Sequence, residues 1–192
     1  MISICFATNN KNKLEEVRSK IGGQFNILSL EDIGCFEELP ETQPTIEGNS
    51  AQKARYVADK YKVDCFADDT GLEVDALSGA PGVYSARYAG PDCHPEDNMR
   101  KLLHEMEGTE NRSAGFKCCI TLIQNGKETV FIGNIRGKIL TEKHGEKGFG
   151  YDPIFQPHGY SVSFAEMSME EKNSIGHRGI AVGKLIEYLQ LV

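Results

Sequence analysis

The sequence predicts an α/β protein built around a mixed β-sheet. The first apolar segment, Ile2–Ala7, has the character of a buried strand, and a segment with helical spacing of apolar residues follows it after a polar turn. Two longer apolar runs, 116–123 and 129–135, are joined around Asn125-Gly126, the dipeptide most typical of a tight hairpin. Two long strands paired in this way indicate a mixed sheet rather than a wholly parallel one.

Further elements are expected between and after these segments. Leu14, Val17 and Ile21 mark the first helix, Phe25–Leu30 a second strand, and 31–48 an acidic, irregular loop. A helix is expected from about Asn49 to Tyr61, and its inward residues are predicted to be Ala51, Ala54, Val57, Ala58 and Tyr61. Later helices are expected at about 95–106, after the capping box Ser168-Met-Glu-Glu171, and after His177-Arg178-Gly179.

Composition limits the classes of function. The chain has 192 residues, of which 40% are hydrophobic, enough for one globular domain over 1–192 or two closely packed lobes. Its formal charge of 21 − 28 = −7 leaves no general basic surface for a nucleic-acid backbone, so no nucleic-acid partner is expected. Six cysteines without a C-x-x-C spacing favour reduced, mostly buried thiols in a cytoplasmic protein. The short apolar N-terminus lacks a basic leader, so neither a signal peptide nor a membrane span is expected there.

The segment Phe66–Leu72 holds the most informative pair of residues. Asp68 and Asp69 follow a short apolar run, and Gly71 then allows the backbone to turn. Carboxylate oxygens held at a strand end suit Mg²⁺, which takes its remaining ligands from substrate phosphates. The alternative is that the two aspartates only cap a turn, as Asp commonly does.

Four other segments are candidates for binding an anion or a base. The polar turn 8–13 precedes a helix N-terminus and therefore suits phosphate, although ordinary capping by Thr8 or Asn10 is an alternative. Lys53 is expected near the first turn of its helix, where it opposes the dipole unless it meets an anion or is simply solvated. The glycine-rich loop 145–155 offers aromatic faces for stacking or forms a tight turn, and Lys172, His177 and Arg178 place donors close together.

Taken together, the motifs resemble those of the inosine triphosphate pyrophosphatase family from end to end and in order. The motifs that carry the resemblance are Ala7-Thr-Asn-Asn-Lys-Asn-Lys13 with Glu16, Glu41-Thr42 with Glu47-Gly48-Asn49 and Lys53-Ala54, Ala67-Asp-Asp-Thr-Gly-Leu72, Gly79-Ala-Pro-Gly-Val-Tyr-Ser-Ala-Arg87, Gly148-Phe-Gly-Tyr-Asp-Pro-Ile-Phe155, and Glu171-Lys172 with Ser174 and His177-Arg178-Gly179. Enzymes of that family hydrolyse non-standard purine nucleoside triphosphates (ITP, dITP and XTP) to the monophosphate and pyrophosphate.

The resemblance implies a role for each matching residue. Asp69 is expected to be the general base and a Mg²⁺ ligand, with Glu41 as a second ligand, Asp68 close to the metal, and Lys53 stabilising phosphate charge. The residues expected to bind substrate are Thr8, Asn9, Asn10 and Lys13 at the phosphates, Thr70, Phe149, Gly150, Tyr151 and Asp152 around the nucleoside, and Lys172, His177 and Arg178 at the oxygen edge of the purine.

The resemblance also implies an α/β fold with a long mixed, twisted sheet flanked by helices in two lobes, a central nucleotide cleft, and a homodimer. One departure affects the metal site: Pro40 and Gln43-Pro44 alter the loop around Glu41, so Glu37, Glu38 and Glu47 are competing ligands. Two rival functions remain open: a related pyrophosphatase acting on modified pyrimidine or methylated nucleotides, and a nucleotide-binding regulator that has lost hydrolysis. A purely structural protein is the remaining alternative, but it leaves the clustered cations unexplained.

Overall fold

The computed structural model describes residues 2–92 and 94–191 and divides into two compact units. Unit 1 contains the described residues of Met1–Asp69, Cys118–Gly133 and His177–Val192, and unit 2 those of Thr70–Lys117 and Asn134–Gly176. A single domain over 1–192 stays a prediction. Among the described residues, no helix combines the length and the apolar character needed to cross a membrane.

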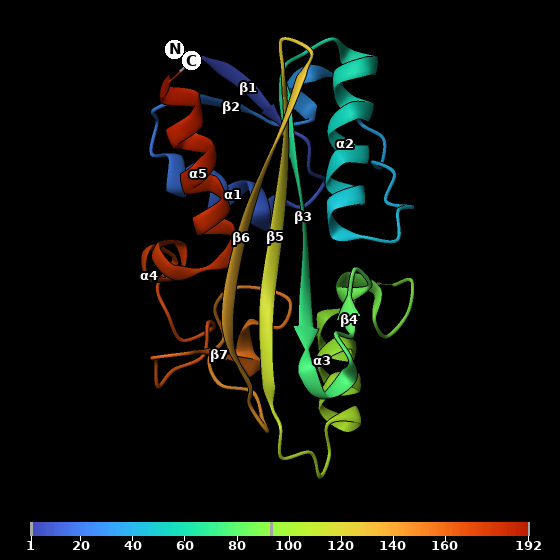
Figure 1. Cartoon of the computed structure of the whole chain (residues 1–192), viewed down its shortest axis with the longest axis vertical. Coiled ribbons are helices and arrows are strands. Elements are labelled where there is room, and N and C mark those ends of the chain that lie inside the picture. Colours follow the sequence, from blue (N-terminus) through green and yellow to red (C-terminus); the bar gives the residue numbers. More distant parts are fainter. Residues whose placement is uncertain (1, 93, 192) are drawn as a thin grey trace. The chain divides into compact units, whose positions relative to one another are not determined.

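Unit 1 contains a mixed sheet whose strands run in the order β2-β1-β3-β5-β6. Strand β1 pairs in parallel with both β2 and β3, and α2 and α5 cover opposite faces of the strands between them (Figure 1). The elements with residues in unit 1 are β1 (Ser3–Phe6), α1 (Lys11–Ile21), β2 (Asn26–Leu28), a 3-10 turn (Glu31–Ile33), α2 (Ile46–Tyr61), β3 (Cys65–Val74), β5 (Ser113–Gln124), β6 (Lys127–Ile139) and α5 (His177–Leu191).

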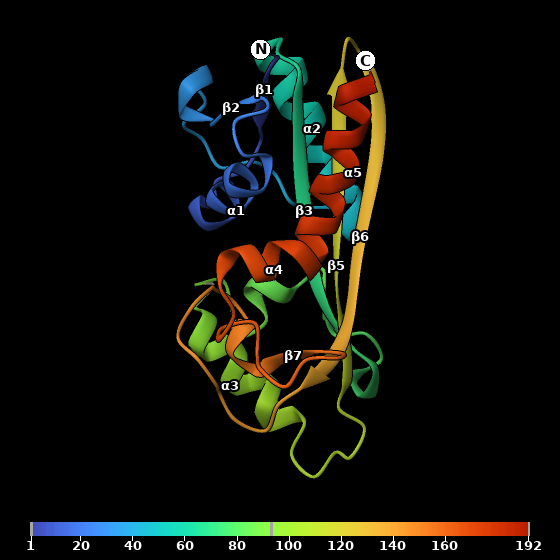
Figure 2. The ribbon, with the colours of Figure 1, turned by 90° about the vertical axis from the view of Figure 1, so that its left-hand side faces the viewer.

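Each face of this sheet has its own apolar core, because successive side chains of a strand point to opposite faces. Ile4 and Phe6 of β1 and Phe66 of β3 pack in one cluster with residues of α1 and α5. Their neighbours along the same strands, including Cys5 and Ala67, pack in a second cluster with residues of α2. The side of the sheet covered by α5 faces the viewer in Figure 2.

Unit 2 contains the continuations of β3, β5 and β6, with β4 paired antiparallel to β3 and β7 paired antiparallel to β6. Leu72 of β3 and Phe116 of β5 share one core cluster with Met99 and Leu102 of α3. The remaining elements of unit 2 are 3-10 turns at Asp75–Leu77, Ser85–Arg87 and Asp152–Ile154, with β4 (Pro81–Gly82), α3 (Pro95–Glu105), β7 (Phe155–Pro157) and α4 (Met169–Ile175).

Most of the predicted elements are confirmed. The mixed α/β sheet flanked by helices is present, and the hairpin turns at Asn125 and Gly126, whose φ angles of 49° and 74° are those of a primed turn. The capping box of Ser168 and Glu171 opens α4 as expected. Five cysteines are free and buried, in agreement with the prediction of reduced thiols, whereas Cys93 lies outside the described residues.

Three expectations about element boundaries were wrong. Strand β3 continues through Asp69 and Gly71 to Val74, so no turn follows the aspartates. Helix α2 begins at Ile46 with Thr45 as its N-cap, which places Lys53 well beyond the first turn. Helix α5 begins at His177 itself, so His177 and Arg178 lie in its first turn rather than before it.

The predicted inward face of α2 is largely confirmed. Ala54 and Val57 are buried, and Ala58 and Tyr61 are partly buried and pack against the same core cluster, whereas Ala51 is only partly buried. The prediction missed three polar residues that α2 also buries: Asn49, Ser50 and Lys53. Hydrophobic spacing does not reveal them, because they are buried with hydrogen-bond and ion-pair partners.

We expect that Gly133→Ala destabilises the protein while Gly183→Ala does not. An added Cβ at Gly133 in β6 would lie 2.0 Å from the carbonyl oxygen of His177 and 2.7 Å from the backbone nitrogen of Ala181, so the first turn of α5 would have to move. A Cβ at Gly183, in the same helix, meets nothing within 4 Å and should add up to about 1 kcal/mol through helix propensity. Urea unfolding of both variants measures the difference, and equal stabilities would contradict the close approach at Gly133.

Candidate active site

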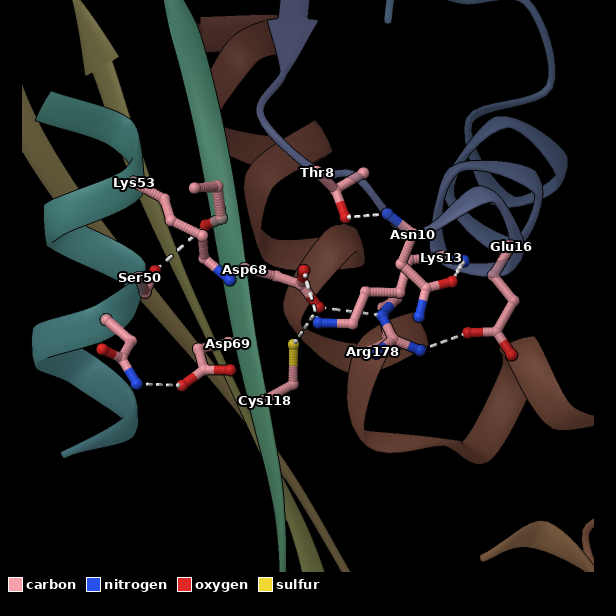
Figure 3. Close-up of polar contacts among 12 residues, drawn as sticks. Thr8, Asn10, Lys13, Glu16, Ser50, Lys53, Asp68, Asp69, Cys118 and Arg178 are labelled. Carbon is pink, nitrogen blue, oxygen red and sulfur yellow. Dashed lines mark hydrogen bonds and ion pairs between the residues drawn. The ribbon is translucent and has the colours of Figure 1, made fainter. Parts of the chain in front are cut away.

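The two adjacent aspartates of β3 point to opposite faces of the sheet. Asp68 is on the side of α1 and α5, and Asp69 is on the side of α2 (Figure 3). This follows from the two-residue period of a strand, since β3 runs without interruption through both positions. The pair is therefore neither a turn cap nor a set of two ligands on one face.

Asp68 is fully buried among cations. Its Oδ1 accepts a hydrogen bond of 3.0 Å from Lys13 Nζ, and its Oδ2 accepts one of 3.0 Å from Arg178 Nε (Figure 3). The Cys118 thiol also lies 3.8 Å from Oδ2. Burial alone would raise the pKa of Asp68, but Lys13, Arg178 and Lys53 outweigh it and hold this pKa below its ordinary range.

Arg178 is held between two carboxylates. Its Nη1 donates to Glu16 of α1, while its Nε donates to Asp68. Burial opposes the charge of the guanidinium, but the two acids raise its pKa. Arg178 is only 4% exposed. Its buried charge therefore neutralises the carboxylates of Asp68 and Glu16.

Asp69 has a different environment. It is 7% exposed, and its Oδ2 accepts a hydrogen bond of 3.2 Å from Nδ2 of Asn49 in α2. Burial raises the pKa of Asp69, and although Lys53 and Lys13 lower it, Glu41 and Asp68 raise it further, so the net shift is upward. A carboxylate with a raised pKa is more basic than an ordinary aspartate, as a general base requires.

Lys53 interacts electrostatically with three acids, Asp69, Glu41 and Asp68. Its Nζ donates to Glu41. Burial lowers the pKa of Lys53, but Asp69, Glu41 and Asp68 raise it above the ordinary value. Burial likewise opposes the charge of Glu41, yet Lys53 and Lys13 lower the pKa of that carboxyl. Among the acids proposed as competitors, Glu37 is bonded instead to Tyr56, Lys60 and Tyr61, so its position favours Glu41 for the site.

The predicted phosphate loop leads directly into α1. Asn10 is the N-cap, and its side chain accepts a hydrogen bond of 3.2 Å from Lys13 N, while Thr8 Oγ1 accepts one of 3.2 Å from Asn10 N (Figure 3). Asn10 therefore caps α1, as the alternative interpretation of this loop predicted. This capping is compatible with phosphate binding, because the first turn of α1 contains no acidic residue and its dipole favours an anion.

Asn9 of the same loop contacts the acidic loop that leads to Glu41. Its Nδ2 donates to the carbonyl oxygen of Glu37 at 3.2 Å, and its Oδ1 accepts from the backbone nitrogen of Leu39 at 3.1 Å.

The carboxylates of the candidate site suit Mg²⁺ better than a metal ion that takes all of its ligands from the protein. Among residues 2–92 and 94–191, no group of three or more His, Cys, Asp or Glu side chains could hold a metal ion. Mg²⁺ commonly needs only one or two carboxylates, with water and substrate phosphates completing its shell. Asp69 and Glu41 are oxygen donors that interact electrostatically with each other, so they fit such a partial site.

A second group of predicted residues lies in unit 2. Lys172 Nζ donates to Asp152 Oδ2 at 2.6 Å and lies 4.8 Å from the centre of the Phe149 ring. Asp152 Oδ2 also accepts from Phe149 N at 2.8 Å. The tight turn requires Gly148, whose φ is +75° and where a Cβ would lie 2.2 Å from Asp152 Oδ2.

The other predicted residues of this loop differ in exposure. The Tyr151 ring packs in the core, and its hydroxyl donates to the carbonyl oxygen of Ser85 at 2.7 Å, which is the tight-turn alternative. Gly150 has a φ of +64° and open space around it. Thr70 follows Asp69 within β3, and His177 is buried at the start of α5 in unit 1. Phe149 is therefore the aromatic residue of this loop that is partly exposed.

The sequence analysis assigned no role to four residues that contact the aspartates, contact Arg178 or hold α2. Ser50 Oγ is hydrogen-bonded to the carbonyl oxygen of Ala67 and to Thr121 Oγ1, and so fixes α2 to the sheet. Asn49 and Glu16 contact Asp69 and Arg178, and Cys118 contacts Asp68. The sequence contains a signal for two of these residues. Asn49 and Ser50 lie four residues before Lys53 and Ala54, and Val57 follows Lys53 by four, so these positions share one side of the helix.

Comparison with known proteins identifies the family of this chain. Residues 4–188 match the model of the Ham1 family. The chain belongs to the Ham1 family. This confirms the resemblance predicted from the sequence motifs.

Relatives of this Ham1-family chain cover nearly its whole length. A protein of Flavobacterium johnsoniae named dITP/XTP pyrophosphatase is 56% identical over 188 residues, covering 98% of both chains. One of Porphyromonas gingivalis with the same name is 48% identical over 190 residues, again covering 98% of both. Among solved structures, a HAM1 protein from Coxiella burnetii matches with a TM-score of 0.91 at 34% identity, covering 100% of both chains. The Staphylococcus aureus Ham1 protein matches with a TM-score of 0.88 at 36% identity, covering 98% of both.

We expect Arg178→Ala to destabilise this Ham1-family chain far more than Arg55→Ala. Removing Arg178 leaves Asp68 and Glu16 buried without their shared cation, a loss of about 3–5 kcal/mol of unfolding free energy. Arg55 also bonds a carboxylate, that of Glu128, but its side chain is 60% exposed, so its loss should cost at most about 1 kcal/mol. Urea unfolding at neutral pH checks both values, and similar losses would show that the Arg178 cluster contributes no more than a surface ion pair.

Proposed function

We propose that this chain hydrolyses ITP, dITP and XTP to the nucleoside monophosphate and pyrophosphate with Mg²⁺. Its membership of the Ham1 family, together with relatives named dITP/XTP pyrophosphatase, makes it a nucleoside-triphosphate pyrophosphatase. The observation that supports the site assignment best is the placement of Asp68 and Asp69 on opposite faces of β3, with Lys13 beside Asp68 and Lys53 in the field of both acids.

The environment of Asp69 suits a general base. Its raised pKa favours accepting a proton, and Lys53 and Lys13 oppose the effect of burial on this pKa. In the proposed reaction, Asp69 orients and deprotonates the water that attacks between the α- and β-phosphates. Asp68 is held below its ordinary pKa and remains a fixed negative charge that positions Lys13.

Lys13 and Lys53 supply the positive charge that a triphosphate needs. The chain is acidic overall, with a formal charge of −7, so a tetra-anion must meet cations that are gathered locally. Both lysines are already oriented by carboxylates, Lys13 by Asp68 and Lys53 by Glu41. When bound, Mg²⁺ would be held by Asp69 and Glu41, and it would neutralise phosphate charge in the transition state.

Specificity for a 6-oxo purine is proposed to depend on hydrogen-bond donors. Such a base accepts hydrogen bonds where adenine's amino group donates, so a site built from donors rejects adenine strongly. Lys172 is a candidate donor in unit 2, oriented by Asp152 and packed over the Phe149 ring. His177 and Arg178, which lie in unit 1, are the other donors that the family resemblance implies. In this structure the guanidinium of Arg178 is bonded to Asp68 and Glu16.

The proposal extends to the state of the protein in the cell. We infer a homodimer located in the cytoplasm. The five described cysteines are free and buried, which suits a reducing compartment.

A substrate panel tests the function directly. We expect pyrophosphate release from ITP, dITP and XTP with Mg²⁺ to exceed release from ATP by about 10²-fold or more in kcat/KM, since the donors of the site match a 6-oxo purine; GTP and dTTP are measured in the same panel. The assay measures pyrophosphate with and without EDTA. Preference for dTTP would favour the related pyrimidine enzyme, and binding without release from any nucleotide would favour the regulator.

Asp69→Asn should abolish most turnover and keep substrate binding. The amide cannot accept the proton of the attacking water, so kcat should fall by about 10²–10⁴-fold. Isothermal titration of ITP in EDTA should give an affinity within a few-fold of the wild type. The matched control is Asp59→Asn, an exposed acid on α2 that should leave kcat unchanged. Normal turnover of the Asp69 variant would remove this residue as the base.

A further inference from the structure

The loop that carries Glu41 is attached to one face of α2 through three consecutive residues. The attached pairs are Glu41 with Lys53, Thr42 with Gln52 and Gln43 with Asn49. Positions 49, 52 and 53 stand at i, i+3 and i+4 of the helix and so share one side of it. The three attachments differ in burial, because Asn49 is 1% exposed, whereas the Thr42–Gln52 bonds are exposed.

Asn49 and Gln52 both use the two ends of their amides, but Gln52 bonds Thr42 alone, whereas Asn49 bonds two different segments. Its Oδ1 accepts a hydrogen bond of 2.9 Å from the backbone nitrogen of Gln43, two residues after Glu41. Its Nδ2 donates a hydrogen bond of 3.2 Å to Asp69 Oδ2. One amide group therefore links the loop of one predicted metal ligand to the side chain of the other.

The chemistry of this position requires an amide. The backbone N–H of Gln43 needs an acceptor, and the carboxylate of Asp69 needs a donor. Aspartate has the same shape but offers acceptors only when ionised, so it would place a second carboxylate oxygen against Asp69. Alanine would satisfy neither partner and would leave buried polar groups without this contact.

The amide is held in place by the neighbouring residue. Ser50 Oγ is hydrogen-bonded at 3.0 Å to the carbonyl oxygen of Ala67 in β3 and at 2.9 Å to Thr121 Oγ1 in β5. Ser50 and Thr121 are both fully buried. The start of α2 is thereby fixed to the strand that carries Asp69, so the position of Asn49 is set by the sheet and not by the loop.

We propose that Asn49 is a positioning residue for the reaction, orienting the Asp69 carboxylate and fixing the loop of Glu41 at the same time. The inference rests on the proposed function, because it assigns Asn49 a role toward the proposed base and its metal-binding partner. Asn49 is assigned no direct part in the chemistry. Its effect passes through Asp69 and Gln43.

Three variants distinguish the effect of losing the Asn49 hydrogen bonds from the effect of loosening the loop that carries Glu41. Asn49→Asp keeps an acceptor for Gln43 N–H and removes the donor to Asp69, Asn49→Ala removes both, and Gln52→Ala loosens the same loop without contact to Asp69. The readouts are kcat and KM for XTP, the Mg²⁺ concentration that gives half-maximal rate, and hydrogen–deuterium exchange of the segment 41–45 without nucleotide or metal.

The expected results differ among the variants. Asn49→Asp should lower kcat and raise the half-maximal Mg²⁺ concentration by about 10–100-fold each, as loss of an outer-shell partner does, with KM for XTP within about threefold. Its exchange in segment 41–45 should match the wild type, whereas Asn49→Ala should exchange faster. Gln52→Ala should keep kcat within about threefold.

Two outcomes would overturn the positioning role. One is an Asn49→Asp variant with wild-type kcat and Mg²⁺ dependence, and the other is a Gln52→Ala variant that loses as much kcat as Asn49→Ala. The wild type in the same assay distinguishes failure of the proposed function. A wild type that releases no pyrophosphate from any triphosphate overturns the function and this role together, whereas an active wild type beside an unaffected Asn49→Asp overturns the role alone.

Discussion

The alternation of side chains along β3 is the constraint on which the candidate site depends. Because β3 is a continuous strand from Cys65 to Val74, Asp68 and Asp69 must face opposite sides of the sheet. Asp68 therefore meets the cations of α1 and α5, and Asp69 meets α2. The two acids acquire opposite shifts in pKa from their surroundings, although they are neighbours in the chain.

Buried charge then dictates much of the packing around the strand. A carboxylate withdrawn from water is tolerated only when it is paired and hydrogen-bonded, so Asp68 needs both Lys13 from the start of α1 and Arg178 from the start of α5. Glu16 completes the neutralisation of Arg178. Segments distant in sequence are thus brought to one position, and the close approach of α5 to β6 at Gly133 allows Arg178 to reach it.

Much of the fold followed from local patterns because local physics decides them. The primed turn at Asn125-Gly126 and the capping box at Ser168 depend on a few adjacent residues, and both are present where they were predicted. The errors occurred where tertiary contacts override local preference. Gly71 indicated a turn but lies within β3, and α2 buries Asn49, Ser50 and Lys53 with polar partners beside its predicted apolar residues.

The sequence by itself determined the main helices and long strands, the hairpin and the family, and it named the acids and lysines of the candidate site, since each of these depends on residue type and spacing. Only the tertiary structure decided which face each aspartate occupies and which partners they acquire. It also decided that Asn49 bridges Asp69 and Gln43. The reason is physical: a hydrogen bond or an ion pair between residues far apart in the chain depends on how the elements pack, which no local pattern specifies.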